Sequence, residues 1–492
     1  MRQHLSLGSL GMLVAASLGC ATQPIVAPLR YQDPPSAPEQ ALRAMPPDSS
    51  PVVPAVALSW RPTTLANGVR VLHLERHDLP IVSASLVITR GAADAHAPDD
   101  LFGLLGLLMT KGTASRTLAE LSAAYASLGS THGVSFGEDG CTLSAKVGSA
   151  GLDTAIALLA EQAIRPRLYS RDFEETRGQW SQDFANTRWD AGMSLQRNAA
   201  VLLFGTTHAY GFAAPSAAHL SGLQLEDLAA LHARVFQPAH AALVVVGDAS
   251  PDAVDASAAR WLGGWSARPE PLARAEVPPP VSAQRVVLIE RRDRTQVDGM
   301  LFVRTPGFAD EDLPAVEVLT KSLGAISSPL REAVRFESGA AYSFGARMTT
   351  LRAASYATIG GAFEASKAGE ALRTIVAAIR AVRTRGVAAA DLERAQATLL
   401  AEFRARVATN DGIVSMASST LLADLWPEAL TGHLARIRAV TPADIRRVAT
   451  RYFADEALHV VVYGDARITG DLAGLGLGLV ERRNGTAEHV GW

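Results

Sequence analysis

The sequence predicts an α+β protein built from two homologous domains, each a sheet packed with helices, that arose by internal duplication. The strand-like segment "VLHLERHD" at Val71–Asp78 recurs as "VVLIERRD" at Val286–Asp293. A helix-like segment followed by "LVVVGD", ending at Asp248, recurs before "HVVVYGD", ending at Asp465. In each pair, the second copy follows the first after nearly the same number of residues, which indicates that the halves correspond along most of their length.

Length and charge limit the classes of protein to consider. The chain has 492 residues, of which 48% are hydrophobic, enough for two to four domains with large cores. The formal net charge is -3, from 46 basic and 49 acidic residues. A nucleic-acid-binding protein usually carries a basic face, so this balance argues against nucleic acid as a partner.

The first 20 residues have the features of an export signal. Arg2 precedes an apolar run that is too short to span a bilayer. Ser17–Cys20 resembles a bacterial lipobox, so we expect the Cys20 thiol to be acylated and the chain to be a lipid-anchored protein of the periplasm or outer membrane. Plain secretion is the alternative. With Cys20 acylated, Cys141 has no intrachain partner, and we interpret it as a small apolar residue in a strand.

Proline-rich segments set the expected boundaries along the chain. Residues 21–58 hold many prolines and are interpreted as a tether, and a second proline-rich break follows the first repeat. The predicted organisation is a signal segment (1–20), a tether (21–58), an N-terminal domain (59–265), a linker (266–284), a C-terminal domain (285–480) and a tail (481–492).

Several elements follow from local patterns. Ile81–Thr89 alternates as a half-buried strand does, and Val134–Val147 is typical of a hairpin that turns at "GEDG". Thr117–Leu128 has helical spacing. Asp391–Val407 is an amphipathic helix for which Asp391 is the expected N-cap.

Five segments, in this order and spacing, resemble the pitrilysin/insulinase family of zinc peptidases in its two-domain, processing-peptidase-like form. The resemblance covers roughly residues 59–480 and implies the fold predicted above. The segments are "LANGVRVLHLER" (Leu65–Arg76), "GLLGLLMTKGT" (Gly103–Thr113), "HAYG" (His208–Gly211), "VVVGD" (Val244–Asp248) and "LGAISSPLREAVRFESGAAYS" (Leu323–Ser343).

The zinc motif of active relatives is missing. That motif is His-x-x-Glu-His, in which two histidines on one helix face bind zinc and the glutamate takes a proton from the bound water. The corresponding residues are Gly103, Gly106 and Leu107, and the third-ligand position falls on Asp183, which we interpret as a solvated helix charge. We therefore expect no metal in this chain. The two glycines either admit a close neighbour or loosen the helix.

No other segment replaces this motif. His73 and His77 lie four residues apart, but on a predicted strand and its end, and are interpreted as surface histidines.

The second half keeps two polar residues of the family pattern. In paired subunits of the family, the zinc-less chain is thought to lend an Arg and a Tyr to its partner, and the stretch "SPLREAVRFESGAAYS" places Arg335 and Tyr342 at those positions. Both can donate hydrogen bonds to a tetrahedral oxyanion. The alternative is a helix-surface charge and a half-buried strand aromatic. Pro329 departs from the family pattern but suits the first turn of a helix.

The resemblance therefore implies a non-catalytic, zinc-less subunit of an exported metallopeptidase. It would form a heterodimer with a zinc-bearing homologue, with a peptide as substrate and zinc as the partner's cofactor. A non-enzymatic envelope scaffold or peptide-binding protein of the same fold is the main alternative. A self-sufficient peptidase is the least favoured reading, because the metal ligands are missing.

Overall fold

The computed structural model describes residues 58–484, apart from residues 98, 132, 188–189, 207, 212–216, 267–271, 273, 278–285, 293 and 326–327. The expected signal segment with Cys20, the tether as far as residue 57 and the tail beyond residue 484 lie outside the described residues. We refer to residues 58–266 as the first half and to residues 286–484 as the second half.

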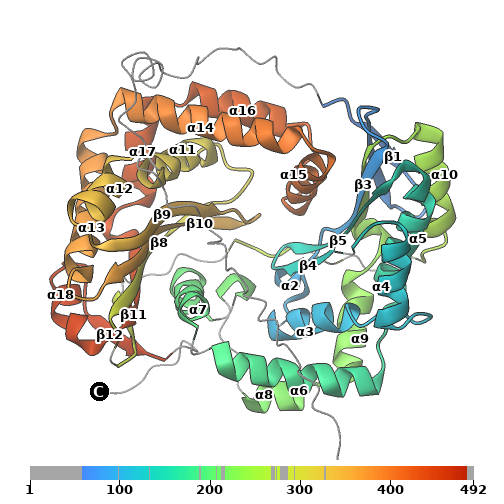
Figure 1. Cartoon of the computed structure of the whole chain (residues 1–492), viewed down its shortest axis with the longest axis horizontal. Coiled ribbons are helices and arrows are strands. Elements are labelled where there is room, and N and C mark those ends of the chain that lie inside the picture. The colour runs from blue at the N-terminus through green and yellow to red at the C-terminus, as the bar shows by residue number, and fades with distance from the viewer. Residues whose placement is uncertain are drawn as a thin grey trace, which may run out of the picture. The chain divides into compact units, whose positions relative to one another are not determined.

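Each half of the described chain contains a six-stranded mixed sheet (Figure 1). The first has the order β1-β2-β6-β3-β5-β4 and the second the order β12-β7-β11-β8-β10-β9. The strands of the first sheet are β1 (Arg61–Thr64), β2 (Arg70–Glu75), β3 (Ile81–Ile88), β4 (Gly133–Gly137), β5 (Gly140–Gly148) and β6 (Ala241–Gly247). Those of the second are β7 (Val286–Glu290), β8 (Gln296–Pro306), β9 (Ala341–Thr349), β10 (Ala354–Glu364), β11 (Leu458–Gly464) and β12 (Val480–Arg483).

The strand pairings repeat between the halves. β6 is parallel to β2 and antiparallel to β3, and β11 is likewise parallel to β7 and antiparallel to β8. The sheets differ at one edge, where β1 is antiparallel to β2 but β12 is parallel to β7. The predicted α+β fold, with two sheets each packed with helices, is confirmed.

Both halves also contain helices. In the first half they are α2 (Ala92–Ala95), α3 (Asp99–Met109), α4 (Leu118–Ser127), α5 (Leu152–Ile164), α6 (Ser170–Thr187), α7 (Ala191–Phe204), α8 (Ala217–Gly222), α9 (Leu225–Val235) and α10 (Pro251–Leu262). In the second half they are α11 (Leu313–Gly324), α12 (Pro329–Arg331), α13 (Ala368–Arg385), α14 (Ala389–Val407), α15 (Asn410–Leu422), α16 (Ala429–Ala439), α17 (Pro442–Tyr452) and α18 (Thr469–Ala473).

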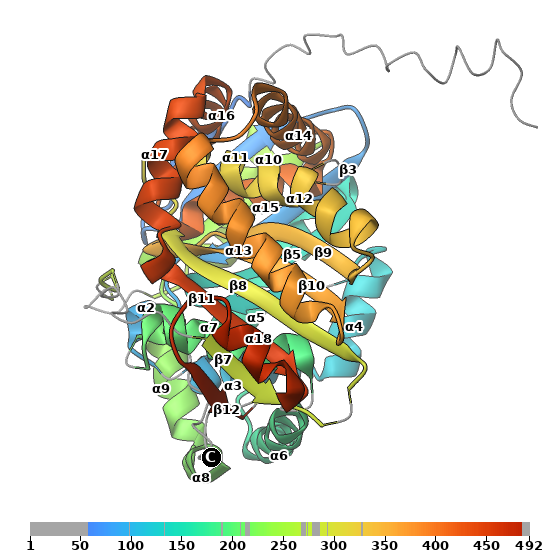
Figure 2. The ribbon, with the colours of Figure 1, turned by 90° about the vertical axis from the view of Figure 1, so that its left-hand side faces the viewer.

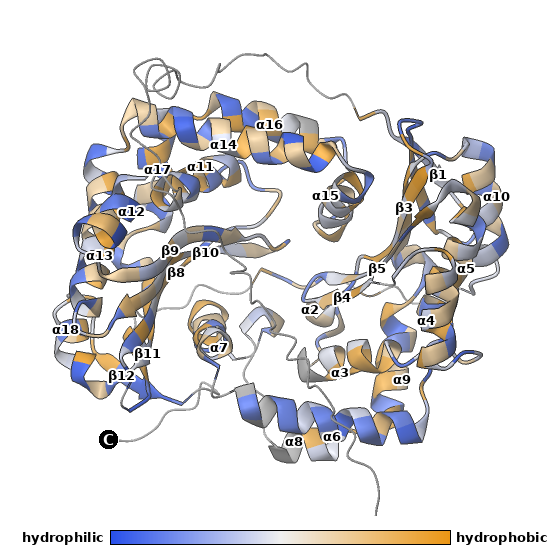
Figure 3. Cartoon of the chain, in the orientation of Figure 1, coloured by the Kyte–Doolittle hydropathy of each residue, from blue (hydrophilic) through white to orange (hydrophobic). Residues whose placement is uncertain are grey.

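One face of each sheet carries that half's own core. In the first half, α5 packs on β3 and β5 while α10 contacts α5 and β2. In the second half, α13 and α17 pack on each other and on the sheet, and Figure 2 shows them together with α18 over its outer face. The buried strands supply the apolar surface. β3 and β11 are largely orange in Figure 3, whereas α6 is mostly blue.

The opposite face of each sheet is covered by a helix from the other half. α7 of the first half contacts β7, β8 and β11 of the second sheet. α15 of the second half contacts β3, β5 and β6 of the first sheet (Figure 1). Both contacts contain a cluster of buried apolar side chains. Leu202 of α7 packs near Val461, and Ala417 of α15 belongs to the same cluster as Val244. This exchange buries apolar area between the halves and stabilises their association.

Most local predictions agree with the observed elements. β3 and the β4–β5 hairpin lie where expected, and α4 has Thr117 as N-cap in a capping box with Glu120. The prediction for Asp391 is wrong, since α14 begins earlier, with Ala388 at the N-cap. Asp391 lies in the first turn, where its carboxylate pairs with Arg394 and is favoured by the helix dipole.

Candidate functional site

α3 is the helix onto which the resemblance maps the zinc motif, and aromatic rings cover its glycines. A Cβ atom added at Gly106 would lie 2.8 Å from Cγ of Phe136 on β4. One added at Gly103 would lie 3.2 Å from Cη2 of Trp180 on α6. Phe136 also packs edge-on against Phe102, with ring centroids 5.0 Å apart. Both glycines therefore serve close packing, one of the two readings that the sequence left open.

The third-ligand position offers no help to a metal. Asp183 on α6 is exposed, and its carboxylate accepts a hydrogen bond from Gln179 Nε2 at 3.0 Å. Trp180 lies three residues earlier on α6, and it is this indole that meets α3 at Gly103.

Zinc does not fit this position. The four motif positions present two glycines, the side chain of Leu107 and one exposed carboxylate, with no imidazole. Stable zinc sites need three or four nitrogen, sulfur or oxygen ligands around the ion. Across the residues that the structure describes, no group of three or more His, Cys, Asp or Glu side chains is arranged to hold a metal.

His73 and His77, interpreted above as surface histidines, have different environments. His73 is 1% exposed in β2, so the surface interpretation is wrong for it, and burial lowers its pKa. A side chain in the middle of a covered strand is buried whatever its polarity. His77 is exposed. Its Nδ1 lies 2.7 Å from Oδ1 of Asp248, and this hydrogen bond raises the pKa of His77.

Arg335 lies in a π-helical turn. Ser328 caps α12 by accepting a hydrogen bond from the Arg331 N–H at 3.1 Å, and Pro329 occupies the first turn. The chain then forms the π-helical turn η4 (Glu332–Glu337). The Arg335 guanidinium lies over the ring of the exposed Phe336, 5.6 Å from its centroid. Turns of this kind are rare and occur frequently at functional sites.

Tyr342 lies in a β-bulge. In the pairing of β9 with β10, Ser343 faces Ala362 and Ala341 faces Phe363, which leaves Tyr342 as an extra residue without a cross-strand partner. The Ala362 N–H donates to Ser343 Oγ at 3.2 Å. Tyr342 is 64% exposed, not half-buried. A bulge changes the direction of a side chain, and η4 contacts β9, so the elements of Arg335 and Tyr342 are neighbours.

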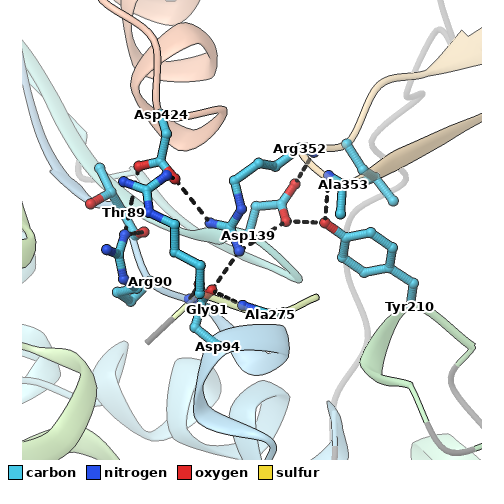
Figure 4. A network of polar contacts seen from close by, with 12 residues as sticks. Thr89, Arg90, Gly91, Asp94, Asp139, Tyr210, Ala275, Arg352, Ala353 and Asp424 are labelled. Carbon is cyan, nitrogen blue, oxygen red and sulfur yellow. Dashed lines mark hydrogen bonds and ion pairs between the residues drawn. The ribbon is translucent and has the colours of Figure 1, made fainter. Parts of the chain in front are cut away.

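A buried charge cluster joins the two halves (Figure 4). Arg352, in the β9–β10 turn, donates from Nη2 to Oδ1 of Asp94 at 2.5 Å. Its backbone N–H donates to Oδ2 of Asp139, in the β4–β5 turn, at 2.7 Å. The side chains of Arg352 and Asp94 are 9% and 0% exposed. Asp94 also accepts from the backbone N–H of Ala275 at 2.9 Å. The cluster thus neutralises buried carboxylates of the first half with a cation of the second.

Two further groups complete this cluster. The Tyr210 hydroxyl, in η2 (Ala209–Gly211), donates to Asp139 and accepts from the Ala353 N–H at 3.3 Å. Asp424, after α15, lies 3.6 Å from Nη1 of Arg90 and also pairs with Arg274 (Figure 4). Burial raises the pKa of Asp139, an effect that the Tyr210 hydrogen bond opposes.

Sequence reasoning did not find this cluster. Its only signals were the turn "GEDG", which contains Asp139, and the segment "HAYG", which contains Tyr210. Neither pattern identifies a residue of the other half as a partner. Single charged residues in turns are normally exposed, so nothing in the sequence distinguished these from solvated groups.

A cleft of about 590 Å³ lies between the β4–β5 hairpin of the first half and the second half. Elements β9, α11, α14, α15 and α16 form its other walls. Neither Arg335 nor Tyr342 lines it.

Comparisons with known proteins agree with this geometry. Residues 222–399 match the family described as the peptidase M16 inactive domain. An uncharacterized zinc protease of Mycobacterium bovis is 27% identical over 303 residues, which span 60% of this chain and 68% of the relative. These matches relate the chain to the pitrilysin/insulinase family, peptidase family M16.

Two solved structures show the same fold as this chain. A protease from Helicobacter pylori superposes with a TM-score of 0.76 at 19% identity, covering 83% of this chain and 100% of that one. A peptidase M16 inactive domain from Pseudomonas fluorescens has a TM-score of 0.76 at 21% identity, covering 83% and 98%. Among the described helices of the chain, none combines the length and apolar character needed to cross a membrane.

Proposed function

We propose that the chain is the zinc-less subunit of an exported M16 metallopeptidase, that it pairs with a zinc-bearing homologue, and that it lends Arg335 and Tyr342 to peptide hydrolysis. The observation that carries this proposal is a contrast between the halves. The zinc position on α3 is packed with aromatic rings, whereas the two donor residues of the second half remain accessible in irregular, unusual backbone segments.

The chemistry suits these two side chains. Hydrolysis of a peptide bond passes through a tetrahedral oxyanion, which is stabilised by hydrogen-bond donors already directed at it. The hydroxyl of Tyr342 and the guanidinium of Arg335 are both donors, and the guanidinium remains charged at any physiological pH. Such donors act only if the partner places its substrate carbonyl beside them, so the proposal requires a heterodimer.

Export and a lipid anchor at Cys20 belong to the same proposal. Acylation would hold the chain at a membrane surface, although one acyl chain alone gives only weak anchoring. Cys20→Ser tests the anchor, and we expect it to move the protein from the membrane fraction to the soluble fraction. Wild-type protein whose N-terminal peptide is unmodified by mass spectrometry would contradict lipidation.

The test of the lent residues uses the purified pair. The full chain is co-expressed with a zinc-bearing M16 homologue, and kcat for a quenched fluorescent peptide is measured. Loss of one oxyanion donor lowers kcat by about 10²–10³-fold, so we expect a fall of this order for Tyr342→Phe and for Arg335→Ala. Tyr169→Phe and Arg385→Ala are matched controls. The first removes a hydroxyl from an exposed position just before α6, and the second removes a guanidinium from an exposed position in α13.

Two outcomes would refute separate parts of the proposal. If the complex forms and both variants cleave at the wild-type rate, the lent-residue role is wrong. If the chain forms no complex with a zinc-bearing homologue, pairing is wrong, and a scaffold or peptide-binding role becomes the better account.

A further inference from the structure

A group of arginines lies where three parallel strands of the second sheet end. β12, β7 and β11 are neighbours in this sheet, and β7 is parallel to both of the others. Their carboxyl ends therefore reach the same side of the sheet, a position at which open sheets commonly bind ligands. Arg482 and Arg483 end β12, and Arg291 and Arg292 follow β7. The backbone N–H of Arg291 donates to the carbonyl of Gly464 at 2.7 Å, which joins this segment to the end of β11.

These four arginines line a pocket of about 470 Å³ that is formed entirely by the second half. Glu290 and Asn484 complete its described lining, which contains no apolar residue. The side-chain amide of Asn198 on α7 donates to the carbonyl of Asn484 at 3.2 Å and so holds the end of β12 in place. The pocket therefore suits a charged or polar group more than a hydrocarbon chain.

Arg483 is the buried member of this lining. It is 8% exposed, and its Nε and Nη2 donate to the two carboxylate oxygens of Glu481, both at 3.0 Å. Its Nη1 is buried without a hydrogen-bond partner among the described residues. A buried donor left unpaired costs free energy, and in proteins such donors are normally completed by another group. Arg483 therefore offers one donor to a ligand that enters the pocket.

Arg292 is the exposed member of the lining. Its side chain is 87% exposed, and its Nε lies 3.7 Å from Oε1 of Glu290, beyond hydrogen-bond distance. Glu290 also pairs with Arg482 through its other oxygen. The guanidinium carbon of Arg291 lies 5.9 Å from the ring centroid of the buried Tyr463, a contact that holds this cation beside the pocket. The lining thus combines cations that are held in place with one that can turn toward a ligand.

Positive charge is in excess around the pocket. The four arginines are accompanied by two acids, Glu290 and Glu481, which leaves a net charge of +2 among these described residues. Asp293 lies outside the described residues, and counting it still leaves the arginines in the majority. Arg467 and Asp465, after β11, pair with each other at 2.9 Å and add no net charge. Because a guanidinium can donate to two oxygens of one phosphate, clustered arginines favour a doubly charged phosphate over a singly charged carboxylate.

We propose that this pocket binds a phosphate group, with Arg292 and the Nη1 donor of Arg483 as its main contacts. A phosphate oxygen would accept a hydrogen bond from this buried donor, and its charge would balance the excess of arginines. The same group occurs in soluble phosphate esters and in the headgroups of anionic lipids. The inference goes beyond the proposed function, because it requires neither the zinc-bearing partner nor acylation of Cys20.

Calorimetry on the full chain tests the site, with glycerol 3-phosphate as the probe and acetate at the same ionic strength as the reference anion. We expect saturable binding of glycerol 3-phosphate and none of acetate. Arg292→Gln should weaken binding about tenfold, the effect of one lost charge-assisted contact, and Arg292→Lys should weaken it less. Arg467→Gln is the matched control, because it removes a guanidinium from the neighbouring strand end but not from the lining, and it should leave the affinity unchanged.

Vesicle flotation separates the two sources of phosphate. The wild-type chain and Arg292→Gln are each mixed with phosphatidylcholine vesicles that contain or lack phosphatidylglycerol. A preference of the wild type for the anionic vesicles, reduced by Arg292→Gln and abolished by added glycerol 3-phosphate, indicates a lipid headgroup as the ligand. Equal flotation of the two chains, together with binding of glycerol 3-phosphate in calorimetry, indicates a soluble phosphate ester.

Two results would overturn the inference. Absence of saturable glycerol 3-phosphate binding would remove the site. A loss of affinity as large for Arg467→Gln as for Arg292→Gln would show a general effect of positive charge and not a contact in the pocket. Arg292 is exposed, so its replacement should leave the fold intact, and circular dichroism of each variant checks this.

Discussion

Replacing Gly106 with alanine tests whether the Phe136 ring occupies the former zinc face of α3. In an open helix interior this change stabilises by about 1 kcal/mol, because alanine is the better helix former. Here the new Cβ would meet Cγ of Phe136 at 2.8 Å, closer than packed carbon atoms approach. Overpacking of a core costs about 1–3 kcal/mol, so we expect Gly106→Ala to be neutral or destabilising by up to about 2 kcal/mol.

Gly178 on α6 provides the matched control. It is also a helical glycine, but a Cβ there would have no neighbour within 4 Å. Gly178→Ala should therefore stabilise by about 1 kcal/mol, and the two variants should differ by about 1–3 kcal/mol.

Urea denaturation followed by tryptophan fluorescence measures this difference as a shift in transition midpoint. Phe136→Leu in the Gly106→Ala background should recover part of the loss, which a double-mutant cycle would detect as coupling. If Gly106→Ala raises the midpoint as much as Gly178→Ala does, the ring does not press on this helix and the account of the packed zinc position is wrong.

Three further predictions concern buried groups. Arg352→Ala leaves the buried Asp94 without its cation and should destabilise by about 3–5 kcal/mol in urea denaturation, an effect whose absence would show that the cluster does not join the halves. Burial raises the pKa of Asp139 above its unfolded value of about 4. The contribution of this carboxyl group to stability is therefore present below about pH 4 and is lost as pH rises through the pKa of the folded state. Asp139→Asn should remove this pH dependence, measured as urea midpoints from acid to neutral pH. Burial also raises the pKa of the Cys141 thiol, so maleimide labelling mapped by mass spectrometry should find Cys141 unmodified in the native chain and modified after denaturation, and rapid native labelling would contradict its burial.

Local patterns predicted the sheets but not how the halves pack on each other. The repeated β-branched runs before Asp248 and Asp465 placed β6 and β11 correctly, since such runs favour buried strands. The exchange of α7 and α15 could not be predicted in this way. An apolar helix face indicates that a helix is buried, yet it does not identify the sheet that covers it. The interpretation of His73 as a surface residue was wrong for a related reason, because its burial depends on neighbours distant in sequence.

Part of the candidate site could likewise be predicted from the sequence, and part could not. The loss of the zinc ligands at Gly103, Gly106 and Leu107 could be predicted from the sequence alone, since each ligand requires a particular residue type. The residues that fill the space, Phe136 and Trp180, lie on other elements, and no spacing rule connects them with α3. The bulge at Tyr342 likewise depends on pairing between two strands and leaves no signature in one of them.

Metal analysis of the purified chain tests the central claim most directly. The full chain is expressed in zinc-supplemented medium, purified without chelator, and its zinc content is measured by plasma mass spectrometry against protein concentration. A position packed by aromatic rings and lacking imidazoles should retain far less than one equivalent of zinc. One tightly held zinc ion per chain would contradict the account.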